Sequence, residues 1–277
     1  MGTKIISVSD EFFGEATRML SDQEPVFIED KYDTHGKWMD GWESKRRRDG
    51  GNDWAIIKLG SPGIISTIEV DTSFFTGNFP PFFSLEGTDS KEIPKNDNEW
   101  IPLITKSSLI GDQKNNFNIE SNITLNYVRL QIFPDGGVAR LRLFGEVKYN
   151  WSNFNNNELI EFSSLNLGGY IITFNNAHYG DVSALLSLGR GKTMGDGWET
   201  RRRREPGNDW IIIKLAKKAI VKNIEIDTAH FKGNFPDQAS IQAVSTSSEL
   251  NVKNIIKDSE KWDFILNKTK LKADNIH

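Results

Sequence analysis

Two segments of the chain place acidic, aromatic and basic side chains in the same order. Residues 40–48 read DGWESKRRR and residues 196–204 read DGWETRRRR. A guanidinium group can bind a carboxylate through two parallel hydrogen bonds, and Asp, Glu and His side chains can transfer protons. The repeated pattern therefore predicts a protein that binds a small organic anion and carries out acid–base chemistry on it.

The arginines are the predicted anchors for that anion. Side chains alternate in direction along an extended segment, so only part of each arginine run can face one ligand. We predict substrate binding by Arg202 and Arg203 in one segment and by Arg46 and Arg47 in the other. The alternative is an internal brace, in which the arginines pair with neighbouring acids and lie over the adjacent tryptophans.

The two tryptophans, Trp42 and Trp198, complete the predicted binding residues. A tryptophan at this place would form a wall of a polar pocket and exclude water from it. The alternative is burial in the core, which is the more frequent role of such a side chain.

Proton transfer needs acidic residues or a histidine near the anion. The catalytic residues that we predict are His230, Asp227, Glu199, Asp71 and Glu43. Asp71 and Asp227 each lead into a Gly-Asn-Phe-Pro turn, where a side chain can project into a pocket or, alternatively, cap the turn. His230 would shuttle protons, and Phe74 stands at its place in the first copy. We expect these groups and the arginines to converge in one cavity.

Composition narrows the classes of site and partner. The chain has 277 residues, a net charge of −4 and no cysteine, and its four histidines show no metal-binding spacing. It contains no phosphate-loop or dinucleotide-binding glycine motif. We predict a small-molecule substrate, no nucleic acid or membrane partner, and no cofactor or metal, with a divalent ion and a homo-oligomer left open. No apolar stretch has the length of a membrane span, so we expect a cytoplasmic protein.

Internal repetition determines the predicted domain organisation. Residues 40–59 match residues 196–215 at 15 of 20 positions, and DTSFFTGNFP (71–80) matches DTAHFKGNFP (227–236) at the same offset. A repeat of this length has the size of a domain. The predicted parts are a first repeat, a polar linker and a second repeat, at residues 1–147, 148–166 and 167–277.

Apolar and polar residues alternate in several stretches, as in antiparallel strands with one buried face. Examples are IISTIEVDT (64–72), YVRLQIF (127–133) and ARLRLFG (139–145). We predict an all-β fold of two tandem jelly-roll β-sandwiches, each with one short helix near its start. Trp262 is the counterpart of Trp100, but no later stretch matches YVRLQIF or ARLRLFG. We therefore expect the second sandwich to be incomplete and to lack its last two strands.

Three stretches resemble the motifs of the allantoicase family: DGWETRRRREPGNDWIIIKLA, DTAHFKGNFP and FPDGGVARLRLFGEV. The resemblance covers nearly all of residues 1–277. It implies tandem jelly-roll domains related to galactose-binding-like sandwiches, and hydrolysis of allantoate to ureidoglycolate and urea in purine (allantoin) degradation. The chain departs from the family in its second repeat, which has no PDGG segment followed by a strand.

The chemistry implied by this resemblance fits the predicted residues. Allantoate carries one carboxylate and two ureido groups on one carbon, and a hydrolase of C–N bonds in linear amidines would break the bond from that carbon to a ureido nitrogen. Arginines would anchor the carboxylate, His230 would transfer the proton, and Asp227 or Glu199 would stabilise the developing positive charge. The alternatives are a non-catalytic carbohydrate- or ligand-binding sandwich and an inactive remnant of the family.

Overall fold

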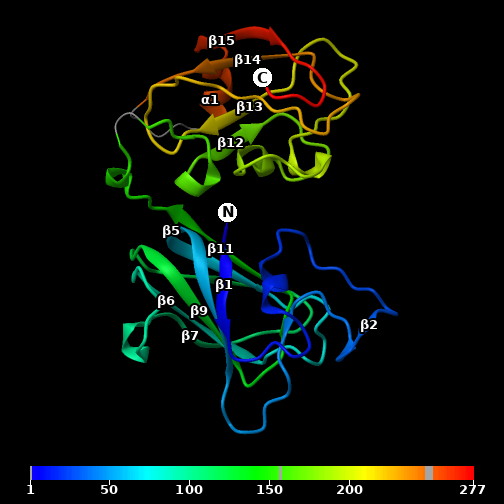
Figure 1. Cartoon of the computed structure of the whole chain (residues 1–277), viewed down its shortest axis with the longest axis vertical. Coiled ribbons are helices and arrows are strands. Elements are labelled where there is room, and N and C mark those ends of the chain that lie inside the picture. The colour runs from blue at the N-terminus through cyan, green and yellow to red at the C-terminus, as the bar shows by residue number, and fades with distance from the viewer. Residues whose placement is uncertain (1, 156–157, 247–251) are drawn as a thin grey trace. The chain divides into compact units, whose positions relative to one another are not determined.

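The chain divides into two compact units, Met1–Asn153 and Phe154–His277 (Figure 1). The computed structural model describes residues 2–155, 158–246 and 252–277. The division lies inside the polar stretch 148–166, and each unit is described by itself below. No helix in the described ranges is long and apolar enough to span a bilayer.

The first unit is built around one long strand, β5 (Asp53–Asp71). Its N-terminal half pairs with β1 (Lys4–Val8) and β9 (Leu125–Phe133). Its C-terminal half pairs with β11 (Arg140–Val147) and β8 (Lys114–Asn118). The register of β5 against β9 shifts between Lys58 and Gly63, where the Gly-Ser-Pro-Gly sequence interrupts the alternation. The two halves of β5 can therefore contribute to the two layers of a β-sandwich.

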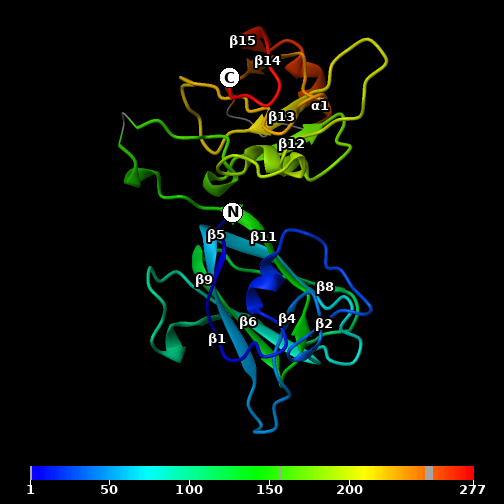
Figure 2. The same cartoon turned by 45° about the vertical axis from the view of Figure 1, so that its right-hand side comes forward.

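Shorter elements complete the first unit. On one side of the sheet, β9 also pairs with β6, which pairs with β7 (Figures 1 and 2). The bounds of these and the remaining elements are β6 (Phe82–Thr88), β7 (Ile101–Ser108), β2 (Tyr32–Asp33), β3 (Gly36–Lys37), β4 (Trp42–Glu43), β10 (Gly137–Val138), and the 3₁₀ helices η1 (Ala16–Leu20), η2 (Asp97–Glu99) and η3 (Trp151–Asn153).

The core confirms the alternation that the sequence predicts. Side chains from both halves of β5 and from β9 meet in one buried cluster, which includes Ile57, Ile68, Leu130 and Ile132. Side chains between them on the opposite face are largely more exposed. Asp71 is an exception, because it belongs to the polar face of β5 and is nevertheless fully buried. The all-β sandwich prediction is therefore confirmed, and the burial of Asp71 needs its own explanation.

The second unit repeats parts of this plan. Strand β12 pairs with β13 as β1 pairs with β5, and both pairs have a register shift at the same place. Strands β14 and β15 correspond to β6 and β7. Within the described residues, the two pairs form separate two-stranded sheets. The elements are β12 (Tyr170–Phe174), β13 (Ile211–Lys214), β14 (Gln238–Ala243), β15 (Asp263–Lys270), α1 (Val252–Ser259), η4 (Leu165–Leu167), η5 (Val182–Leu186) and η6 (Met194–Asp196).

Candidate functional site

Glu43 lies in strand β4, and two neighbouring segments fix its backbone from opposite sides. On one side Gly137 of β10 is its partner in the antiparallel register. On the other side Gly14 forms a bridge, with N–H···O distances of 3.0 Å in both directions. A Cβ atom at Gly14 would lie 2.4 Å from the carbonyl oxygen of Gly41, so only glycine permits this close approach.

The Glu43 side chain is a buried carboxyl group with one defined partner. The Asn78 side-chain amide donates a hydrogen bond to Oε1 of Glu43 at 2.7 Å. Burial raises the pKa of Glu43, the bond from Asn78 opposes this effect in part, and the charge of Asp33 adds to it. A carboxyl group with a raised pKa keeps its proton at higher pH, which suits a proton donor.

The same pair occurs in the second unit. The Asn234 amide donates to Oε1 of Glu199 at 2.6 Å. The backbone of Glu199 bridges Tyr179, as Glu43 bridges Gly14. The sequence pattern presents the glutamates and the Gly-Asn-Phe-Pro turns as separate features and indicates no role for Asn78 or Asn234. The signal that could have linked them is that both motifs recur at one offset.

Asp71 and Asp227 occupy equivalent turns. Oδ1 of Asp71 accepts a hydrogen bond from the Ser73 amide at 2.8 Å, and Oδ1 of Asp227 accepts one from the Ala229 amide at 2.8 Å. This is the turn-capping arrangement that the sequence left as the alternative. The other oxygen differs between the copies. Oδ2 of Asp227 accepts from Nε of Arg190 at 3.0 Å, whereas the buried Oδ2 of Asp71 has no hydrogen-bond partner among the described residues.

Residues 137–139 connect the motifs of the first unit. Gly137 lies opposite Glu43 in the β4–β10 pair and donates its amide proton to the carbonyl of Asn78 at 2.7 Å. Two residues further on, Ala139 donates to the carbonyl of Asp71 at 2.8 Å. The DGWE, DTSFF, GNFP and PDGG segments therefore converge on β10, although they are far apart in the sequence.

His230 takes a left-handed backbone conformation, as Phe74 does in the first unit. Both have φ of 70°, and both donate their amide proton to an aspartate side chain, Asp274 at 2.8 Å and Asp112 at 2.7 Å. The His230 ring lies 2.8 Å from the carbonyl oxygen of Gly191, which can only accept, so Nε2 carries a proton. His230 thus belongs to the same turn as Asp227.

The arginine runs contain both braced and unengaged side chains. Arg47 donates to Asp49 at 2.8 Å and to Asp53 at 2.5 Å, and Arg203 donates to Asp209 at 2.7 Å. These contacts form the internal brace that the sequence left open. Arg46 and Arg202 are exposed, and their side chains have no hydrogen bond or ion pair with a residue that the structure describes.

The tryptophans are anchored by their indole N–H groups. Trp42 is fully buried in the core and donates to the carbonyl of Asp10 at 2.8 Å. Trp198 is half-buried and donates to the carbonyl of Asn176 at 2.8 Å. Core packing, the alternative that the sequence left open, is therefore the arrangement observed at Trp42.

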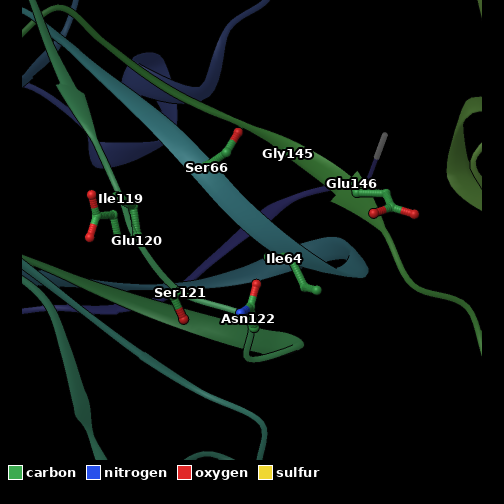
Figure 3. A pocket seen from close by; sticks show the side chains of 8 residues that line it. All are labelled: Ile64, Ser66, Ile119, Glu120, Ser121, Asn122, Gly145 and Glu146. Carbon is green, nitrogen blue, oxygen red and sulfur yellow. The ribbon is translucent and has the colours of Figure 1, made fainter.

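Two hollows in the first unit lie away from the predicted residues. One, of about 640 Å³, is lined by β5, β11 and the segment after β8 (Figure 3). The other, of about 450 Å³, is lined by β1 and residues around η1. Neither contains an arginine or a carboxylate of the repeated motifs, so neither is the shared cavity that we expected. Among the described residues, no three His, Asp or Glu side chains form a group that could hold a metal ion.

The fold and these sites define a class of protein: a tandem of β-sandwich repeats, each with a Glu–Asn pair and a capped Asp turn. The family model described as "Allantoicase repeat" matches residues 1–148 and 160–277. "Probable allantoicase" of Acinetobacter baylyi is 44% identical over 277 residues, and "Probable allantoicase 2" of Burkholderia mallei is 42% identical over 278. Each match covers 100% of this chain and 82% of the relative.

Solved structures agree with the sequence relatives. The crystal structure of allantoicase from Saccharomyces cerevisiae matches with a TM-score of 0.82 and 32% identity, over 100% of this chain and 80% of that one. A second allantoicase structure gives a TM-score of 0.82 at 31% identity. The chain belongs to the allantoicase family.

Proposed function

We propose that this protein hydrolyses allantoate, with one water molecule, to ureidoglycolate and urea. The observation that carries the proposal is the full-length match to relatives named allantoicase, at 42% and 44% identity. The duplicated Glu–Asn pairs and Asp turns supply residues that suit this chemistry. The substrate is therefore a small organic acid with two ureido groups.

The reaction breaks the bond between the central carbon of allantoate and one ureido nitrogen. A proton must reach that nitrogen as urea leaves, because an unprotonated ureido anion is a poor leaving group. The lone pair of the remaining ureido nitrogen assists the departure and leaves an iminium-like cation. Water then adds to the central carbon and loses a proton, which gives ureidoglycolate.

Glu43 is the proton donor in this proposal. Its burial raises its pKa, so it keeps its proton to a higher pH than an exposed glutamate does. The hydrogen bond from Asn78 fixes its Oε1, which leaves the second oxygen to carry the proton. Asp71 would stabilise the cation. Glu199, Asp227 and His230 are the corresponding candidates in the second repeat.

The substrate carboxylate needs a cation that is not already paired. Arg47 and Arg203 hold neighbouring aspartates, so we assign them to bracing their own loops. Arg46 and Arg202 are exposed beside them, and their guanidinium groups have no hydrogen bond or ion pair with a described residue. We assign the carboxylate to these two arginines, because a guanidinium fork matches a carboxylate in geometry and charge.

The test is incubation of the purified protein with allantoate, with urea and ureidoglycolate both measured. Hydrolysis releases the two products in equal amounts. A ligand-binding sandwich would bind allantoate without releasing urea, and an inactive remnant of the family would do neither. Repeating the assay after dialysis against a chelator tests the prediction that the reaction needs no metal. The cytoplasmic location and the oligomeric state stay predictions.

A further inference from the structure

The two Asp turns are alike except at one oxygen atom. In both, Oδ1 caps the turn at 2.8 Å. The following threonine, Thr72 or Thr228, donates its hydroxyl proton to a carbonyl of a later segment, that of Ile110 or Lys272. Oδ2 of Asp227 binds the guanidinium group of Arg190 at 3.0 Å. Oδ2 of Asp71 is buried without a partner among the described residues. The second repeat therefore shows which kind of group complements this oxygen, namely a planar N–H donor.

The segment between the 3₁₀ helix and the DGWE motif explains this difference. It comprises residues 21–40 in the first repeat, which we call the strap, and residues 187–196 in the second. The short segment carries Arg190, which reaches Asp227. The strap is ten residues longer and supplies no donor to Asp71.

The strap covers Asp71 through the residues around it. Arg140 and Lys114 lie opposite Asp71 on the two neighbouring strands. Gln23 of the strap accepts a hydrogen bond at its carbonyl from Arg140 at 2.8 Å, and the adjacent Glu24 accepts one from Lys114 at 2.9 Å. The position between these two contacts is that of Asp71, which explains why a residue of the polar face is buried.

A third contact extends the cover along the turn. The Phe27 ring of the strap stacks on Phe74, with ring centroids 5.7 Å apart. Phe27, Phe74 and the Glu24–Lys114 pair are all exposed, so these contacts are weak. Asp40 anchors the other end of the strap on the buried Arg140 at 2.7 Å. The amide of Val26 also donates to Oδ2 of Asp40 at 3.0 Å. The Glu24–Phe27 part can therefore lift by breaking this hydrogen bond and the exposed contacts, while the Asp40–Arg140 pair holds.

We infer that Oδ2 of Asp71 accepts hydrogen bonds from a ureido group of the substrate beneath the strap, and that the matching position of the second repeat is filled by its own Arg190. Ureido and guanidinium groups are both planar, and both present N–H donors on two nitrogens bonded to the same carbon. Each chain then holds one ligand, in its first repeat. This inference rests on the proposed function for the identity of the ligand.

The test uses ureidoacetate, which carries one carboxylate and one ureido group and has no second ureido nitrogen to expel urea. Calorimetric titration of the full chain should give one site per chain. Asp71→Asn keeps the capping oxygen and replaces Oδ2 with a donor, so the affinity should fall about 10- to 150-fold. Glu69→Gln, the same chemical change two residues back on the same strand, should leave the affinity within about twofold.

The outcomes separate this inference from the proposed function. Urea release from allantoate with unchanged ureidoacetate binding in Asp71→Asn would overturn the inference and leave the function intact. Binding that depends on Asp71 without any urea release would support the inference and remove the function. A wild-type chain that binds no ureidoacetate, or binds two molecules, also overturns the inference.

If Asp71→Asn fails to fold, which a circular-dichroism melting curve would reveal, a second variant tests the inference. Phe27 is exposed, so Phe27→Ala should fold, and loss of its stack on Phe74 should weaken ureidoacetate binding about two- to tenfold. An unchanged affinity in this variant contradicts a ligand site beneath the strap.

Discussion

At the scale of residues, the two Glu–Asn pairs share a geometry and differ in burial. Glu43 is buried and Glu199 is half-buried, although their amide partners lie at 2.7 and 2.6 Å. Burial is the largest cause of the raised pKa of Glu43. This raised pKa is the reason for assigning the proton-donor role to Glu43.

Glu43→Gln should lower kcat for urea release about 100-fold or more, because the amide keeps the bond from Asn78 but has no proton to give. In the wild type, activity should fall as pH rises through the raised pKa of Glu43. The variant should lose this alkaline limb. A pH–rate profile checks both effects, and an unchanged profile in the variant would exclude Glu43 as the donor.

The same change should stabilise the fold at neutral pH. The folded pKa of Glu43 lies above its ordinary value of 4.5, so the folded state binds this proton more tightly than the unfolded state does. Its ionisation therefore costs stability as pH rises through the folded pKa, and costs nothing below the ordinary value. Across this pH range, the melting temperature of Glu43→Gln should increase relative to that of the wild type as pH increases. A constant difference would contradict the linkage.

Arg46→Lys should raise KM for allantoate about tenfold or more and change kcat little, because lysine keeps the charge and loses the two-bond fork. Arg202→Lys should leave KM unchanged if Arg190 fills the second site, and should raise KM if the second repeat also binds the substrate. The matched control is Arg48→Lys, the same substitution at a neighbouring exposed arginine, which should leave KM unchanged. Steady-state kinetics decide between them, and unchanged KM in both predicted anchors would remove the arginine assignment.

At the scale of elements, periodicity predicted the strands but not the strap that covers the end of β5. The alternation in residues 64–72, 127–133 and 139–145 gave the strands and the buried faces of β5, β9 and β11. It placed Asp71 on the polar face, and contacts of the strap with residues far apart in the sequence then bury Asp71. Because alternation reports only local geometry, a covering loop leaves no trace in it.

The Glu43–Asn78 pair escaped prediction for a similar reason. Its partners are separated by 35 residues and belong to a two-residue strand and an irregular turn. Neither element has a period from which facing positions can be counted. The arginines illustrate the converse, because Arg47 and Asp53 are close in sequence and this spacing already indicates a brace between them.

The strap should depend on its buried anchor more than on its exposed contacts. Asp40→Asn weakens the pairing of the buried Arg140 guanidinium and should cost about 3 kcal/mol of unfolding free energy. Glu24→Gln removes an exposed ion pair and should cost less than about 1 kcal/mol. Thermal unfolding of the two variants gives the comparison, and equal losses would contradict the buried anchor.

The same anchor predicts an acid dependence. Burial acts to raise the pKa of Asp40, but the hydrogen bond and charge of Arg140 and the amide of Val26 outweigh it, so the pKa is lowered. The resulting stabilisation is present above the ordinary value of 3.8 and is lost as pH falls through the lowered value. The stability difference between the wild type and Asp40→Asn should therefore shrink in acid.

At the scale of the whole molecule, apolar burial is unequally divided. Both core clusters described belong to the first unit, and they join β5 and β9 with the loops of the motifs. The second unit holds two separate strand pairs within its described residues. The first unit should therefore be the more stable of the two, because stability follows the local density of buried contacts.

Hydrogen–deuterium exchange should show this difference directly. Backbone amides of β5 and β9 should exchange slowest, because they lie in the middle of the large sheet. Amides of β12 and β14 should exchange much faster under the same conditions. Equal protection in the two units would show that apolar burial within each unit does not determine its stability.

The left-handed backbone at Phe74 and His230 carries a consequence for recognising further copies of this domain. Glycine adopts a φ of 70° without strain, whereas a ring-bearing residue pays a conformational cost there. Both repeats have this strained conformation at the same position of the same turn. They therefore share a structural feature that does not depend on their overall sequence identity. A bulky ring two residues after an Asp-Thr pair and shortly before Gly-Asn-Phe-Pro should therefore identify diverged copies in which the rest of the sequence no longer aligns.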